Sequence, residues 1–95
     1  MAPIRRLVLD VLKPHDPNVA EYAREISEAA TVEALTLSLV ETDREVQNLK
    51  LTIEGEGLDV AAIEDRIQDV GGSVHSIDEV SCGEFVVTER RTPQD

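Results

Sequence analysis

Apolar and polar residues alternate along four stretches of this chain, and two other stretches repeat apolar residues every three or four positions. The alternation predicts β-strands with one buried face over residues 4–12, 32–41, 46–54 and 73–80. The helical spacing predicts one amphipathic helix after the turn at residues 13–18 and a second one after Asp59. Because the alternation is interrupted by only a short polar turn at residues 41–45, the second and third strands are expected to form a hairpin.

Residues with capping propensity mark the ends of both predicted helices. Asp16 is expected to cap the first helix, with Pro17 at the first helical position, where its missing N–H costs nothing. Asp59 is expected to cap the second helix, which Gly71 and Gly72 should end with a residue in the left-handed conformation.

The order of elements, strand-helix-strand followed by strand-helix-strand, predicts an α+β, ferredoxin-like βαββαβ fold. Four antiparallel strands would carry two helices on one face, and the core would be aliphatic because aromatic residues make up only 2% of the chain. Residues 1–88 form the expected single domain, with a short edge strand at 85–87 and a polar, loose tail at 89–95. The other sheet face lacks a helix of its own, and we expect copies of the same chain to cover it.

The last strand contains VHSIDEV, residues 74–80, in which neither set of alternating residues is purely apolar. Placing Ile77 toward the helices brings His75 and Glu79 with it, whereas placing Val74 and Val80 there brings Asp78. A β-bulge or a partner chain would resolve this conflict.

Charge restricts the partners of the protein. Twenty acidic residues against nine basic ones give a net charge of −11, which disfavours nucleic acids and anionic membranes. Scarce lysine beside excess acid predicts a protein adapted to high salt, where the self-repulsion is screened. The single cysteine, Cys82, allows no internal disulfide, and the absence of a signal-like or membrane-spanning run predicts a cytoplasmic protein.

The first strand lies beside the last and third strands in this fold, so Asp10 is expected to neighbour the VHSIDEV segment and Lys50. One interpretation is a metal or ligand site formed by Asp10, His75, Asp78 and Glu79. Imidazole with carboxylates suits zinc or manganese, and carboxylates with carbonyls suit calcium or magnesium. The alternative is a hydrogen-bonded histidine with carboxylates in ion pairs at the rim of the sheet, because no tight ligand spacing is present.

Arginines and the acidic hairpin turn are the candidates for contacts between copies of the chain. Arginine forms bidentate bonds with carboxylates, so pairs across a subunit boundary are a natural use for it. The turn carboxylates are also candidates for holding a hard cation such as calcium between subunits. The candidate interface residues are Arg5, Arg6, Arg44, Glu41 and Asp43.

Three blocks of this sequence resemble the archaeal domain-of-unknown-function family 211. These are RRLVLDVLKPHDP (5–17), SLVETDREVQNLKLTIEG (38–55) and GGSVHSIDEVSCG (71–83). The resemblance implies a ferredoxin-like fold and a ring-shaped homo-oligomer, and it implies no reaction. Together with the acidic, lysine-poor composition, it points to a member from salt-loving archaea.

The hypothesis from the sequence is a non-enzymatic, ring-forming homo-oligomer that binds a small ligand or a divalent metal ion. The alternative is an enzyme whose site is shared between subunits, with Asp10 or His75 as acid-base group and Arg5 or Lys50 holding an anionic substrate. A purely structural or protein-binding subunit without a small ligand is a third interpretation.

Overall fold

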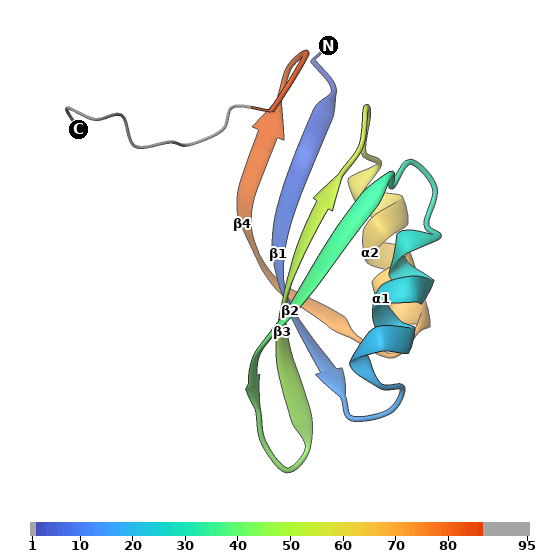
Figure 1. Ribbon diagram of the computed structural model, residues 1–95, viewed down its shortest axis with the longest axis vertical. Helices are drawn as coiled ribbons and strands as arrows, with labels where there is room; N and C mark the ends of the chain where they lie inside the picture. The colour runs from blue at the N-terminus through green and yellow to red at the C-terminus, as the bar shows by residue number, and fades with distance from the viewer. Residues whose placement is uncertain (1, 87–95) are drawn as a thin grey trace, which may run out of the picture.

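The predicted strands and helices are present in the predicted order in a computed structural model that describes residues 2–86. The elements are β1 (Ile4–Pro14), α1 (Val19–Ser27), β2 (Ala34–Thr42), β3 (Val46–Glu54), α2 (Val60–Asp69) and β4 (Ser73–Cys82). The strands form one antiparallel sheet in the order β2-β3-β1-β4, and both helices lie side by side on one face of it (Figure 1). The ferredoxin-like α+β arrangement is thus confirmed.

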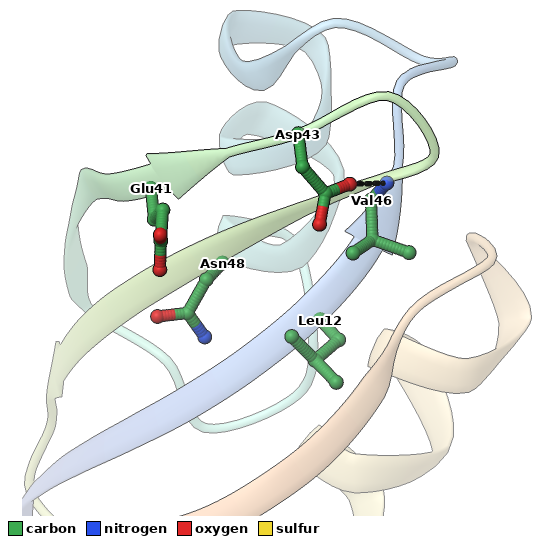
Figure 2. Close-up of a pocket in the computed structure, with 5 residues that line it drawn as sticks. All are labelled: Leu12, Glu41, Asp43, Val46 and Asn48. Atoms are coloured by element: carbon green, nitrogen blue, oxygen red, sulfur yellow. Dashed lines mark hydrogen bonds between the residues drawn. The ribbon is translucent and has the colours of Figure 1, made fainter.

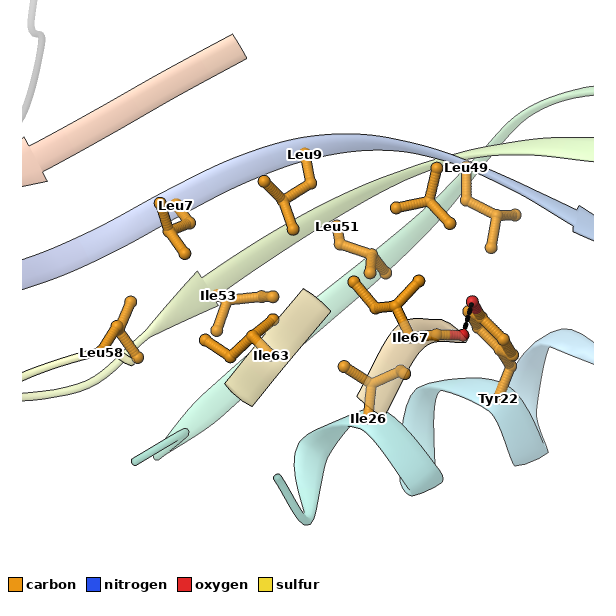
Figure 3. Close-up of a cluster of buried hydrophobic side chains, with 11 residues drawn as sticks. Leu7, Leu9, Tyr22, Ile26, Leu49, Leu51, Ile53, Leu58, Ile63 and Ile67 are labelled. Carbon is orange, nitrogen blue, oxygen red and sulfur yellow. Dashed lines mark hydrogen bonds between the residues drawn. The ribbon is translucent and has the colours of Figure 1, made fainter. Parts of the chain in front are cut away.

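The core lies between the two helices and the central strands β1 and β3. The register of these strands runs without a shift from Arg6 opposite Glu54 to Pro14 opposite Val46, so alternate residues of both strands face the helices. The fully buried members of the core are Leu7, Leu9, Val11, Leu49, Leu51 and Ile53 from the sheet, and Tyr22, Ile26, Ile63 and Ile67 from the helices (Figure 3). The core is therefore aliphatic apart from one tyrosine ring.

The cap of the first helix differs from the prediction. The N-cap of α1 is Asn18, whose side-chain oxygen accepts a hydrogen bond from Glu21 N at 2.8 Å, so the assignment of Asp16 and Pro17 to these positions is wrong. The predicted cap of α2 is confirmed, because Asp59 accepts from Ala62 N at 3.1 Å.

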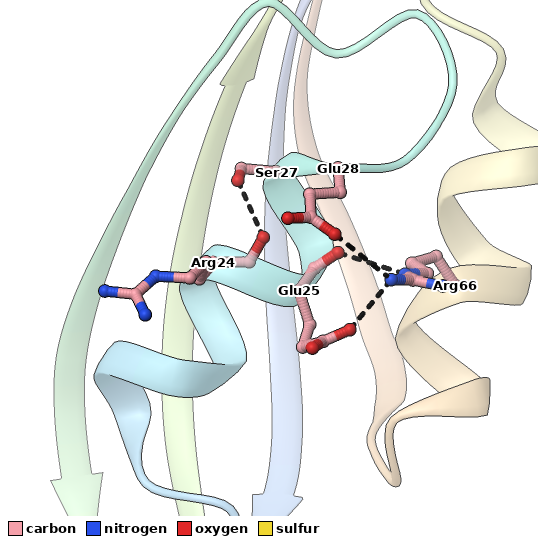
Figure 4. Close-up of polar contacts among 5 residues, drawn as sticks. All are labelled: Arg24, Glu25, Ser27, Glu28 and Arg66. Atoms are coloured by element: carbon pink, nitrogen blue, oxygen red, sulfur yellow. Dashed lines mark hydrogen bonds and ion pairs between the residues drawn. The ribbon is translucent and has the colours of Figure 1, made fainter.

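The two helices are joined by one arginine. Arg66 of α2 donates through Nε to the carbonyl oxygen of Glu25 at 3.0 Å, and through Nη2 to the carboxylate of Glu25 at 2.8 Å (Figure 4). The carboxylate of Glu28 lies 3.9 Å from the same nitrogen. Within residues 2–86, neither helix has the length and apolar character needed to span a bilayer.

A lysine lies in the interior, where a turn was expected. β1 continues to Pro14, and the inward alternation that places Leu9 and Val11 in the core therefore includes Lys13, which is 1% exposed. Its ammonium group donates to Pro14 O at 2.7 Å and to Gln47 Oε1 at 2.9 Å, and lies 5.5 Å from the centre of the Tyr22 ring. Burial lowers the pKa of Lys13 and raises that of Tyr22 to about 12.

The chain beyond β4 is described only as far as Val86. Gly83 has φ +121° and remains attached to β1, because its N–H donates to Pro3 O at 2.9 Å. Phe85 and Val86 belong to no strand in the described part of the chain. The rest of the predicted edge strand, Val87, and the predicted tail at 89–95 lie outside the described residues.

Candidate functional site

The helix-free face of the sheet carries polar side chains that bond to one another. Arg6 on β1 donates through Nε to Glu54 on β3 at 2.9 Å and through Nη1 to Glu79 on β4 at 3.2 Å. These two hydrogen bonds raise the pKa of Arg6 above its ordinary value. Val8, two residues along β1 on the same face, is only 8% exposed. This end of the face is thus held together within one chain.

Asp10 lies near the middle of β1, on the helix-free face. It lies opposite Lys50 of β3 and opposite Ser76 of β4, so both expected neighbours are confirmed. Its carboxylate accepts a hydrogen bond from the side-chain amide of Asn48. The face is therefore polar and internally bonded, and its central strands present no broad apolar surface to water.

The conflict in the VHSIDEV segment is resolved by bulges. The ladder between β1 and β4 shifts register between Asp10 and Val11, where His75 is the extra residue, and again between Val8 and Leu9, where Asp78 is the extra residue. After these shifts Val74, Ile77 and Val80 lie opposite the inward residues Val11, Leu9 and Leu7. A bulge, one of the two resolutions considered, therefore explains the segment within a single chain.

The four residues proposed as a metal site have separate surroundings. The Asp10 carboxylate bonds to Asn48, and the Glu79 carboxylate bonds to Arg6. Asp78 accepts a hydrogen bond from Ser76 Oγ at 2.7 Å, and His75 is exposed. Across residues 2–86, no three His, Cys, Asp or Glu side chains come together as a group able to hold a metal ion. One chain alone therefore does not supply this ligand set.

The acid-base pair of the alternative hypothesis is likewise not assembled in one chain. His75 belongs to a bulge and Asp10 lies opposite its neighbour Ser76, yet no hydrogen bond between Asp10 and His75 is found among the described residues. A general base must lie within hydrogen-bond distance of the proton that it removes, whether a second side chain or a substrate carries that proton. An enzyme would thus have to complete this pair with a second subunit.

The three arginines proposed for the interface have different surroundings. Arg5 donates to Gly83 O at 2.7 Å and Arg6 forms the ion pairs described above, so both stabilise the ends of β1 and β4 within the chain. Arg44 and Glu41 are exposed near the end of the β2-β3 hairpin, where a second copy has access to them.

Asp43 shapes the turn of this hairpin. Its Oδ1 accepts hydrogen bonds from the backbone N–H groups of Glu45 and Val46, both at 2.9 Å. These bonds, with a smaller contribution from the nearby His15, lower the pKa of Asp43. The His15 ring nitrogen Nε2 also lies 2.6 Å from the carbonyl oxygen of Asp43, which connects the β1-α1 loop to the hairpin.

A small pocket of about 190 Å³ lies between the hairpin and the end of β1 (Figure 2). Its lining combines two carboxylates, one amide and two aliphatic side chains: Glu41, Asp43, Asn48, Leu12 and Val46. The register shift between Leu39 and Glu41 places Glu41 opposite Asn48. Because the nitrogen of the Asn48 amide bonds to Asp10, the atom of this amide available to a ligand is its oxygen.

Exposed apolar side chains are concentrated at the two edges of the sheet. Every large hydrophobic residue exposed in the described part of the chain lies on β2, at the start of β3, on β4 or three residues after β4, and none is on a helix. They are Leu39, Val40, Val46, Ile77, Val80 and Phe85. In the sequence, the consecutive apolar residues Leu39 and Val40 break the alternation of this strand. This break was the available sign that an apolar side chain of β2 would be exposed.

Comparisons with known proteins agree on one family. Residues 5–95 match the profile of DUF211, a family described as uncharacterised ArCR. The chain is also 44% identical over 92 residues to the uncharacterized protein MJ0319 of Methanocaldococcus jannaschii, an alignment that covers 97% of this chain and 95% of that protein.

Proposed function

This chain belongs to the DUF211 family, and we propose that it is a non-enzymatic subunit of a ring-shaped homo-oligomer that binds a small ligand or divalent cation. The observation that carries the proposal is that four of the six exposed large apolar side chains in residues 2–86 lie on the two edge strands, namely Leu39, Val40, Ile77 and Val80. Exposed sheet edges present unpaired backbone groups, and proteins normally protect them with charges or cover them. Apolar residues at both edges instead favour contact with another chain.

The two edges differ from each other, and this difference favours a ring. The β2 edge carries Leu39 and Val40 beside the acidic hairpin, and the β4 edge carries Ile77 and Val80 beside two bulges. A contact between unlike edges is heterologous, and such contacts generate a closed ring when the rotation between neighbours closes. The polar helix-free face would then line the assembly without having to be covered by another subunit.

Sedimentation velocity at micromolar concentration, in dilute and in concentrated salt, tests the assembly. We expect an oligomer whose population increases with salt, because copies that each carry a charge of −11 repel one another. Val40→Lys should shift the protein toward the monomer, since Val40 is 61% exposed and its replacement leaves the core intact. Ala61→Lys, at an exposed position of α2, is the matched control and should leave the mass unchanged. A wild-type monomer under every salt condition would contradict the proposal.

The pocket at the hairpin is the part of the chain that best suits the cation. Two carboxylates and an amide oxygen are the hard ligands that calcium and magnesium prefer, and a neighbouring subunit or water would complete the coordination. Titration of chelator-treated protein with calcium, followed by calorimetry, should show binding that Glu41→Gln weakens. Glu56→Gln, at another exposed turn, is the control. Unchanged heat and unchanged melting temperature on adding calcium or magnesium would exclude this cation site.

A further inference from the structure

The edge of β2 is a better template for an added strand than the edge of β4. Its register with β3 is uninterrupted from Ala34 to Leu39, and the only shift comes just before Glu41. The ladder of β4 with β1 is shifted three times, twice by extra residues of β4 itself. Bulges twist an edge away and prevent regular pairing, so a further strand would pair more readily with β2.

The sequence after β4 has the composition of a strand. It reads FVVTERR over residues 85–91 and combines an aromatic and β-branched residues, which favour strands, with two adjacent arginines. Phe85 is 73% exposed, the largest exposed fraction among the large hydrophobic side chains of the described residues. Residues 85–91 would extend over about 20 Å, at about 3.3 Å per residue, which is enough to run along most of β2.

The two arginines at the end of this segment complement the carboxylates of the β2 edge, although Glu84 and Glu89 leave residues 84–91 without a net charge. Glu41, Asp43 and Glu45 lie together at the hairpin end of that edge, and Arg90 and Arg91 close the apolar part of the segment. Pairing these charges also sets the direction, because residue 85 would then lie about 17 Å back along β2, toward its beginning. The segment would therefore run parallel to β2, with its apolar residues along the regular part of the edge.

The segment cannot reach the β2 edge of its own chain. Gly83 is held at the start of β1 by the bonds from its N–H to Pro3 O and from Arg5 to its carbonyl oxygen. Phe85 lies only two residues further, a span of at most about 8 Å. A strand added outside β2 would be four positions from β4, about 19 Å away. The segment that pairs with this edge would therefore belong to a second copy.

We infer that residues 84–91 of one copy add as a parallel strand to the β2 edge of the next copy, with Arg90 and Arg91 beside Glu41, Asp43 and Glu45. The arginines and the proposed divalent cation would then compete for the carboxylates of Glu41 and Asp43. Each copy gives one segment and accepts another, so the contact is heterologous and rests on the proposed assembly. Main-chain hydrogen bonds would supply affinity, and the arginine-carboxylate pairs would fix the register.

A charge swap tests this contact in the full-length chain. The tail variant is Arg90→Glu with Arg91→Glu, and the edge variant is Glu41→Arg with Glu45→Arg. Both variants keep the core, and circular dichroism would verify their folding. In about 0.15 M salt, where charges further apart than about 8 Å are screened, each variant alone should dissociate at least tenfold more readily than the wild type. The single change Arg90→Glu should weaken assembly more than Arg24→Glu, a reversal at an exposed position of α1.

Mixing the two variants gives the decisive result. In the mixture, a glutamate-bearing segment meets an arginine-bearing edge, and the unmodified segment meets the unmodified edge, so both kinds of contact are attractive again. We expect assembly to return in the mixture, with the two variants alternating in closed rings that have an even number of subunits. An oligomer that is insensitive to both variants, or variants that dissociate and are not rescued by mixing, would overturn the strand addition while leaving the ring proposal intact. A monomeric wild type would instead remove the proposed assembly itself.

Discussion

Adding a single methyl group at Gly72 tests how tightly the end of β1 is packed against the helices. A Cβ at this position would lie 1.9 Å from the hydroxyl oxygen of Tyr22, which is far closer than any real contact. The Tyr22 ring is fully buried, its hydroxyl lies 3.4 Å from Ile67 O (Figure 3), and its face contacts the Lys13 ammonium group. Gly72→Ala must therefore displace a ring that covers a buried charge.

The expected cost follows from these contacts. Overpacking a core by one methyl group costs about 1–3 kcal/mol, and moving the ring away from Lys13 adds about 1 kcal/mol of lost cation–π attraction. We therefore expect Gly72→Ala to lower the free energy of unfolding by about 3 kcal/mol. Tyr22→Phe alone should cost about 1 kcal/mol, because the long bond to Ile67 is lost while the ring remains. In that background the new methyl group meets ring carbon Cζ at 3.0 Å and Leu12 O at 3.2 Å, contacts that small shifts can relieve.

Urea unfolding of both single variants and of the double variant measures the coupling. We expect the double variant to be about 1–2 kcal/mol more stable than the sum of the single changes predicts. Gly71→Ala is the control, because its cost comes from the backbone, at φ +96°, and no atom lies within 4 Å of its Cβ. It should not couple to Tyr22→Phe. Additivity of Gly72→Ala and Tyr22→Phe within about 0.5 kcal/mol would refute the packing argument.

Three further predictions concern charges. Arg66→Lys should lower the free energy of unfolding by about 1 kcal/mol in urea titrations. The two bonds to Glu25 come from separate nitrogens of the rigid guanidinium fork, Nε and Nη2, and a lysine has only one nitrogen at the end of a flexible chain. The folded-state pKa of Asp43 is lowered, so its carboxylate stabilises the fold at pH values above its ordinary pKa of 3.8. This stabilisation is lost as the pH falls through the folded-state pKa. The melting temperatures of the wild type and Asp43→Asn should therefore differ at neutral pH and converge in acid. Raising the salt concentration should raise the melting temperature by screening the net charge of −11, and a fall would contradict the predicted adaptation to salt.

The element types were predictable because the hydrophobic period is unambiguous in most of the chain. The bounds of β3 match the prediction, since Leu49, Leu51 and Ile53 alternate with polar residues throughout. The first helix cap was not predictable to the residue, because Asp16 and Asn18 are both good caps and only the path of the backbone selects one of them. Similarly, Lys13 continues the inward alternation of β1, but a lysine before a proline suggests a turn.

The candidate site was less predictable because it depends on pairing between distant strands. The sequence of β4 shows that its two faces conflict, yet the positions of the bulges at His75 and Asp78 are determined by the β1 residues opposite. The same strand pairing places Glu79 beside Arg6, whereas its neighbour Asp78 is the extra residue of a bulge. A metal-ligand set whose members come mainly from one strand cannot be predicted from sequence when the pairing of that strand with its neighbour shifts register between those members.

The distribution of basic residues explains why assembly would be directional. Of the nine lysines and arginines, four are engaged within the described fold: Arg5, Arg6, Lys13 and Arg66. Of the other five, Arg90 and Arg91 are the only adjacent pair. A symmetric contact between two β2 edges would bring the carboxylates of Glu41, Asp43 and Glu45 in both copies together, and like charges at a shared edge repel. The acidic hairpin therefore disfavours edge-to-edge dimers and favours a partner that brings arginine to the same edge.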